Sequence, residues 1–109
     1  MGKPTVLFDG RIGTQSVHVW LEWRDGDLLL GSQELGPALE PYFGESEIET
    51  FLTVKAAQLP KLARALGCRP TKRSIEAAMV ERYRGDSSAT SHLTALLAEN
   101  AIPYEFYSI

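Results

Sequence analysis

Carboxylate and aromatic side chains concentrate in one stretch of the chain, and these residue types are well suited to binding a partner. Eight Asp and Glu residues lie between Glu22 and Glu49, where Arg24 is the only basic residue. Aromatic side chains anchor many protein interfaces, and carboxylates attract a cationic partner and speed its capture. In the alternative interpretation, Trp23 and Phe43 belong to the core and the carboxylates only keep the surface soluble. The candidate partner-binding residues are Trp20, Glu22, Asp25, Asp27, Glu40, Tyr42, Glu45, Glu47 and Glu49.

The net charge of −3 conceals an asymmetry between the two halves of the chain. Residues 1–50 carry nine Asp/Glu and three Lys/Arg, a balance of −6, whereas residues 51–109 carry five and eight, a balance of +3. Clustered cations can bind a phosphate backbone, so the second half raises the question of nucleic acid. The chain is acidic overall and has no RNA-binding aromatic motif, so we interpret the cations as a solvated helical face. They are Lys61, Arg64, Arg69, Lys72 and Arg73.

Catalytic and metal-binding motifs are not found in the sequence. It has no P-loop, no G-x-G-x-x-G, no H-E-x-x-H and no G-x-S-x-G. His18 and His92 are far apart along the chain, with no cysteine at metal-ligand spacing. The serines near His92 are better explained as helix caps, because a catalytic triad is defined by spatial geometry. We therefore expect no catalytic, cofactor-binding or metal-binding residues, and a protein that is not an enzyme.

Length and composition predict one soluble domain spanning residues 1–109. The chain is 44% hydrophobic and 23% charged, which is ordinary for a globular protein. It has no apolar run near the roughly 20 residues that cross a bilayer and no apolar segment typical of a secretory signal, so we expect a cytoplasmic protein without membrane contact. The single cysteine, Cys68, excludes an internal disulfide. Nearby cations are able to lower its pKa, although an incidental loop residue is the simpler interpretation.

Hydrophobic periodicity predicts strands in the first half of the chain. VLFDG is a short apolar run that ends in a turn signal, and SVHVWLEW and EIETFLTV alternate between apolar and polar positions. Asp-Gly at residues 25–26 favours a tight hairpin, which we expect from Ser16 to Glu34. In the fourth strand the alternation predicts one buried face formed by Ile48, Thr50, Leu52 and Val54. PALEPYFG, at residues 37–44, is expected to form one short helical turn.

The second half predicts three helices and a last strand. Apolar residues at helical spacing begin after Ala56, with Pro60 tolerated in the first turn and Gly67 as a natural stop. Ser74 is the expected N-cap of the second helix, and Gly85 ends it. A third helix begins at Ser87, Ser88 or Thr90 and ends near Asn100. IPYEFYSI then alternates as a closing strand.

The predicted fold class is α+β, with a mostly antiparallel β-sheet and about three helices packed on one face. The predicted order is β-β-β-β-α-α-α-β, and strands followed by helices are typical of this layer architecture. Such a sheet can leave its other face in water. The open face would then take some of its side chains from His18, Trp20, Glu22, Glu49, Phe51, Glu105 and Tyr107.

Four stretches resemble a group of small bacterial immunity proteins of toxin–immunity pairs. In that group a hairpin arm precedes an acidic strand, a helix ending in L-x-x-A-L-G, and a terminal strand containing I-P-Y-E-F. The resemblance covers roughly residues 26–109, and the group offers no catalytic residues to carry over. Where the pattern often has Tyr, this chain has Ile48. The matching stretches are GDLLLGSQELG, FGESEIETFLTV, LPKLARALG and LLAENAIPYEFYSI.

The resemblance implies a cytoplasmic immunity or inhibitor-like protein that neutralises a cognate bacterial toxin domain by protein–protein contact. A cationic toxin would fit the acidic first half of the chain. Two alternatives stay open. One is a structural or regulatory module that self-associates through the terminal strand. Both a monomer and a homodimer are therefore open as the state of the chain. The other is an enzyme with a dispersed site around His18 or His92.

Overall fold

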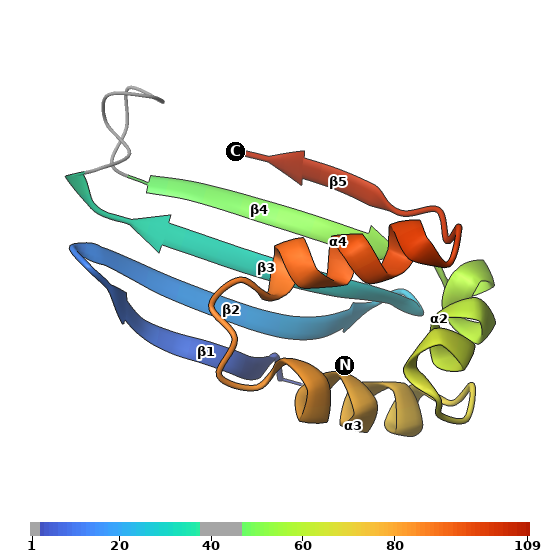
Figure 1. Cartoon of the computed structure of the whole chain (residues 1–109). Coiled ribbons are helices and arrows are strands. Elements are labelled where there is room, and N and C mark those ends of the chain that lie inside the picture. The colour runs from blue at the N-terminus through green and yellow to red at the C-terminus, as the bar shows by residue number, and fades with distance from the viewer. Residues whose placement is uncertain (1–2, 38–46) are drawn as a thin grey trace.

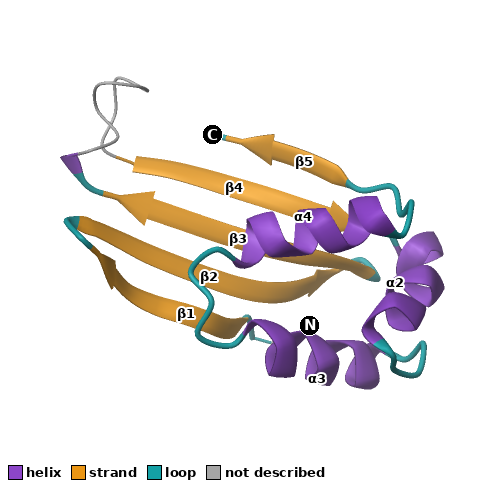
Figure 2. Cartoon of the chain, viewed as in Figure 1, coloured by secondary structure: helices purple, strands orange, loops and turns teal. Residues whose placement is uncertain are grey.

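The computed structural model describes residues 3–37 and 47–109, which form a five-stranded antiparallel sheet with three α-helices against one face (Figures 1 and 2). This confirms the predicted fold class and element order. The predicted helical turn at residues 37–44 lies almost wholly outside the described residues. The strands are β1 (Thr5–Ile12), β2 (Gln15–Arg24), β3 (Asp27–Leu35), β4 (Glu47–Val54) and β5 (Glu105–Ser108). The helices are η2 (Ala56–Gln58, 3-10), α2 (Leu59–Leu66), α3 (Lys72–Tyr83) and α4 (Ala89–Glu99).

The strands lie in chain order, β1-β2-β3-β4-β5, and each pairs antiparallel with the next. The predicted hairpin is β2–β3, where Trp23 pairs with Leu28 and Arg24 with Asp27. Its two turn residues, Asp25 and Gly26, have φ of 53° and 87°. Two consecutive positive φ values are what a tight hairpin turn requires, and Asp-Gly supplies them at little cost. The turn therefore fixes the register of the central strands.

One hydrophobic core fills the space between the sheet and the helices. Val17, Val19 and Leu21 of β2 are buried, which confirms the predicted alternation along that strand. Burial of such side chains contributes about 1.5–3 kcal/mol each relative to full exposure, so this layer dominates folding stability. The remaining buried apolar residues of the core are Leu7, Leu28, Leu30, Leu52, Val54, Leu62, Ala63, Ile75, Met79, Tyr83, Ala89, Leu93, Leu96, Leu97 and Ile102.

Helix boundaries follow local sequence signals, with one correction. Pro60 lies in the first turn of α2, and Gly67 ends this helix with φ of 74°, as predicted. Helix α3 begins earlier than predicted, because Thr71 rather than Ser74 is the N-cap. The Thr71 hydroxyl accepts a hydrogen bond from the Ser74 backbone N–H, at 3.1 Å. Thr and Ser are both good N-cap residues. The helix begins after Thr71, which makes it about one turn longer than a start after Ser74.

The helices gather toward the end of the sheet that carries the β2–β3 turn (Figure 1). At that end of β4, Leu52 and Val54 are fully buried, whereas Ile48 at the other end is only partly buried and lies outside the core. The prediction that Ile48 belongs to the buried face with Leu52 and Val54 was therefore wrong, since Ile48 is only partly buried. Alternation fixes the side of the sheet on which a residue lies, but it does not say how far the helices reach along the strand.

This uneven coverage predicts different costs for two truncations in the same strand. Leu52→Ala removes side-chain volume from a site with no solvent exposure, and we expect it to lower the free energy of unfolding by about 2–5 kcal/mol. Ile48→Ala should cost less than about 1 kcal/mol, because its site is already partly wet. Urea unfolding followed by circular dichroism measures both. Equal costs would contradict the described limit of the core.

Candidate functional site

The face of the sheet opposite the helices carries a line of apolar residues that crosses all five strands. Strand register places Val6, Trp20, Gly31, Phe51 and Tyr107 side by side, one from each strand in order. The open face of an antiparallel sheet is usually polar, because alternation gives its residues to water. Here Val6 and Tyr107 are 52% and 53% exposed. An apolar line on this face therefore requires an explanation other than folding.

The aromatic rings of this line contact one another. The ring centroids of Trp20 and Phe51 are 6.2 Å apart in an edge-to-face arrangement, and those of Phe51 and Tyr107 are 5.2 Å apart and stacked. The His18 imidazole stacks on Trp20 from the neighbouring position of the same face, at 5.4 Å. Such pairs are favourable beyond the area they bury. We call Trp20, Phe51 and Tyr107, together with His18, the aromatic line.

Gly31 makes room for the line. A Cβ atom built at Gly31 would lie 2.3 Å from Cζ2 of Trp20, because the indole crosses β3 at this residue. The Trp20 Nε1–H also donates to Oε1 of Glu22 at 2.9 Å, and Arg24 Nη2 donates to the other oxygen of that carboxylate at 3.0 Å. The indole therefore lies flat against the sheet, because Gly31 has no side chain that would displace it and Glu22 accepts a hydrogen bond from its edge.

Carboxylates flank the aromatic line on both sides. Strand register places Glu22 and Glu105 in the row on one side, and Asp9 and Glu49 in the row on the other. Glu47 lies farther along the face, where it accepts a hydrogen bond from Gln33 Nε2 at 2.6 Å. The face therefore combines an apolar centre with an acidic surround.

The predicted partner-binding residues lie in different parts of the structure. Trp20, Glu22, Glu47 and Glu49 lie on the open face, as the strand alternation requires. Asp25 is exposed at the tip of the β2–β3 turn. Glu40, Tyr42 and Glu45 lie outside the described residues, so their prediction stays untested. The prediction left out Phe51, Tyr107 and Glu105, although alternation had marked all three as possible open-face residues.

Asp27 has a structural role. Its Oδ1 accepts a hydrogen bond from the Ala56 backbone N–H at 2.7 Å, and its Oδ2 lies 2.9 Å from Lys55 Nζ. The hydrogen bond from Lys55, and then that from Ala56, hold the pKa of the Asp27 carboxyl below its usual range. The contact ties the start of β3 to the end of β4. Asp27 also borders a shallow hollow at this end of the open face, lined by Arg24, Asp25, Asp27, Leu29, Thr53, Lys55, Glu105 and Tyr107.

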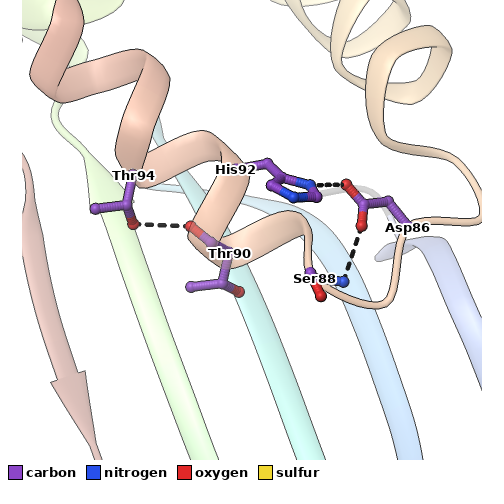
Figure 3. A network of polar contacts seen from close by, with 5 residues as sticks. All are labelled: Asp86, Ser88, Thr90, His92 and Thr94. Carbon is purple, nitrogen blue, oxygen red and sulfur yellow. Dashed lines mark hydrogen bonds and ion pairs between the residues drawn. The ribbon is translucent and has the colours of Figure 1, made fainter. Parts of the chain in front are cut away.

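Both histidines lie near carboxylates, His18 at a partly buried position and His92 at an exposed one. His18 Nδ1 is 3.6 Å from Asp9 Oδ1, with 38% of the histidine side chain exposed. His92 Nδ1 is 2.5 Å from Asp86 Oδ2, with the histidine 61% exposed, and Asp86 Oδ1 accepts from the Ser88 backbone N–H (Figure 3). Asp86 thus closes the loop at the start of α4, and the partner atom of Ser88 is its amide rather than its hydroxyl. This geometry suits a helix start better than a catalytic site.

The five clustered cations of the second half lie on or beside helices α2 and α3, whereas Lys55 follows β4 and borders the hollow of the open face. Lys61, Arg64, Arg69 and Arg73 are exposed, and Lys72 Nζ lies 5.3 Å from the centroid of the Trp23 ring. Trp23 itself faces the helices, where its Nε1–H donates to Glu76 Oε1 at 2.8 Å. These five cations therefore lie on the helical side of the molecule, apart from the carboxylates that flank the aromatic line.

Burial raises the pKa of the Cys68 thiol. Desolvation of the thiolate is the cause, so none of the described residues around Cys68 activates it, which agrees with the simpler interpretation of an incidental residue. Among residues 3–37 and 47–109, no group of three or more His, Cys, Asp and Glu side chains is arranged to hold a metal ion. Over the same ranges, no helix is long and apolar enough to cross a membrane.

Comparisons with known proteins add no relative: no family model matches the chain, and neither curated proteins nor solved structures give a match. The resemblance to immunity proteins therefore stays a hypothesis that depends on the motifs alone. The function must be argued from the geometry of the open face.

The packing of Trp20 over Gly31 predicts a coupling between the two positions. Gly31→Ala should lower the free energy of unfolding by about 1–3 kcal/mol, because the new methyl group displaces the indole from Glu22 and Phe51. In a Trp20→Ala background the same change should cost much less. A double-mutant cycle by urea unfolding measures the coupling. An equal cost in both backgrounds would show that the indole does not occupy this space.

The ion pair of Asp27 predicts a pH-dependent contribution to stability. Asp27→Asn should cost about 1 kcal/mol at neutral pH, because a charge-assisted hydrogen bond and the pairing with Lys55 are lost. A lowered carboxyl pKa stabilises the folded chain above the unfolded pKa of about 4, and this contribution disappears as pH falls through the folded pKa. The difference between wild type and variant should therefore shrink in acid.

The matched control is Asp25→Asn, in the same turn. Asp25 is exposed and has a positive φ that Asn also accepts, so its replacement should leave stability nearly unchanged at every pH. Thermal unfolding between neutral and acid pH follows both variants. A pH-independent loss in Asp27→Asn would contradict the assignment.

Proposed function

We propose that the protein is a binding protein that docks its open sheet face on a cationic surface of another protein, in the manner of an immunity protein that neutralises a toxin. The carrying observation is the aromatic line of Trp20, Phe51 and Tyr107, exposed in part and surrounded by carboxylates. Tyr and Trp offer large contact area with few rotatable bonds, so they lose little entropy on binding. Such residues near the middle of a surface are the usual anchors of an interface.

The dimensions of the open face suit a protein partner. Five strands about 4.8 Å apart span roughly 20 Å, and eight residues at about 3.3 Å each span roughly 26 Å. The projected area is then about 500 Å², before side-chain relief is counted. A standard interface takes about 800 Å² of accessible surface from each partner. The face is large enough for a small interface and too flat to enclose a small molecule.

The charges of the face favour a cationic partner. Two of its cations are already paired internally, Arg24 with Glu22 and Lys55 with Asp27. Glu49 makes no ion pair with any residue that the structure describes, and Asp25 and Glu105 are exposed. These carboxylates would attract a positive surface over a Debye length of about 8 Å in physiological salt. They would speed association more than they would strengthen the final complex.

A secreted toxin domain is the partner class that the motif resemblance suggests. Many such toxins are cationic nucleases, and an inhibitor that presents carboxylates where nucleic acid lies would block the active site or its surroundings. On this proposal the protein is not an enzyme. The two exposed histidines, each beside a carboxylate outside an enclosed cavity, do not favour the alternative of a dispersed catalytic site.

The test uses the protein encoded by the adjacent reading frame, which this proposal requires to contain a secreted toxin domain. Glu49→Lys combined with Glu105→Lys reverses charge on both sides of the aromatic line. We expect the association rate with that domain, measured by biolayer interferometry at low salt, to fall at least about tenfold, with a smaller effect at high salt. Tyr107→Ala should mainly speed dissociation.

The control reverses two carboxylates on the helical side, Glu81 and Glu99, both exposed, and changes the net charge equally. This variant should keep the wild-type rate and should protect cells that express the toxin domain. If both double variants slow association alike, the open face is not the binding surface. If the neighbouring gene encodes no toxin domain, or the wild-type chain does not bind it, the immunity proposal is wrong.

A further inference from the structure

The two edges of the sheet differ in how they are protected against pairing with another strand. Edge strand β1 contains a bulge between Val6 and Phe8, and the backbone oxygen of the intervening Leu7 accepts a hydrogen bond from Gly85 N–H at 2.8 Å. A bulge and a covering loop are common devices that keep an edge from pairing. Within the part of the chain that the structure describes, edge strand β5 pairs with β4 alone, and all four of its residues are exposed. It contains no lysine, proline or bulge.

The direction of the free backbone groups in β5 follows from one pair of hydrogen bonds. Ile109 and Glu49 exchange both backbone bonds, at 2.8 and 3.2 Å. In an antiparallel pair, residues bonded to one neighbour alternate with residues whose N–H and C=O point the other way. Because Tyr107 is two residues from Ile109, it also bonds toward β4. Phe106 and Ser108 therefore present their N–H and C=O groups at the free edge.

We infer that β5 pairs antiparallel with β5 of a second copy of this chain, about a two-fold axis at Phe106. In this register Phe106 and its counterpart exchange both of their outward backbone hydrogen bonds. Their rings, each 51% exposed in the single chain, meet on the helix side of the sheet. On the open face each Glu105 lies opposite Tyr107 of the other copy rather than opposite another carboxylate. The edge is thus complementary to itself, which a two-fold contact requires.

The two-fold axis is perpendicular to the sheet, so both open faces lie on the same side of the dimer. The two aromatic lines then meet near the axis, where Tyr107 of each copy is close to Tyr107 of the other. A ten-stranded open sheet is within the range that proteins form. This inference does not rest on the proposed toxin partner, since it follows from the backbone edge alone. A partner with two-fold symmetry would find a doubled surface.

The strand contact is small, so the dimer should be in equilibrium with the monomer. One strand pair and a few side chains bury less than about 1,200 Å², the range of weak complexes, and a dissociation constant in the micromolar range is expected. Sedimentation equilibrium of the full chain over a concentration series tests this. The wild-type chain should shift from monomer toward dimer as concentration rises to a few hundred micromolar, about ten times or more the expected constant.

Two variants block the edge by different means. Phe106→Lys places a charge at the centre of the contact, at a side chain that is already half exposed. Ser108→Pro removes an N–H that points away from β4, so the β4–β5 hydrogen bonds remain. Both should weaken dimerisation at least tenfold while the circular dichroism spectrum stays that of the wild type. The matched control is Ile12→Lys on the opposite edge, where Ile12 is 52% exposed, and it should dimerise like the wild type.

Three results would overturn the inference: a wild-type chain that stays monomeric throughout the series, a dimer that persists in both β5 variants, or a dimer lost equally in Ile12→Lys. The experiment is independent of the charge-reversal test. A chain that binds its toxin domain as a monomer would retain the proposed function and lose this inference.

Discussion

The structure depends on the two-residue period of its strands, combined with a core on only one side of the sheet. Val19, Leu30 and Leu52 must face the helices, since each contributes apolar area that keeps the chain folded. Because adjacent residues of a strand point to opposite faces, their neighbours Trp20, Gly31 and Phe51 then lie on the open face. A one-residue slip between strands would bury carboxylates and expose the core, at a cost far above the stability of a domain this size. Core packing therefore fixes the register of the residues on the open face.

On the open face, the requirements of folding stability differ from those of the proposed binding. Stacking between Phe51 and Tyr107 is favourable, but about half of the Tyr107 side chain stays in water. A polar residue at this position would make the folded protein more soluble. Gly31 weakens the centre of β3, where a β-branched residue would favour the strand. These choices hold the Trp20 indole flat against the sheet. The Trp20 Nε1–H donates a hydrogen bond to the Glu22 carboxylate, so this acidic residue also orients the indole.

Local patterns were sufficient to predict the fold. Asp25–Gly26 required a hairpin, Gly67 ended a helix, and the change from a period of two to a period near 3.6 separated sheet from helices. Competition between similar residues was harder to resolve, as Thr71 and Ser74 show at the start of α3. The reach of the helices along β4 depends on how α2 to α4 pack, which no single segment determines. Ile48 therefore remained partly exposed although its alternation matches that of Leu52.

The candidate site was only partly predictable, because its members come from strands far apart in sequence. The run of carboxylates from Glu22 to Glu49 predicted both Asp27 and Glu49 as partner-binding residues. In the structure the Asp27 carboxylate stabilises the junction of β3 and β4, whereas Glu49 faces water. Charge content along the chain does not separate these roles.

The aromatic line needs the order β1-β2-β3-β4-β5, because only then do Trp20, Phe51 and Tyr107 become neighbours. The last strand is decisive here. Beside β4, β5 completes the line and leaves an edge whose outward backbone groups have no strand partner among residues 3–37 and 47–109. The residues that extend the proposed binding surface therefore also form the edge that we infer to pair with a second chain, so one four-residue strand would serve both contacts.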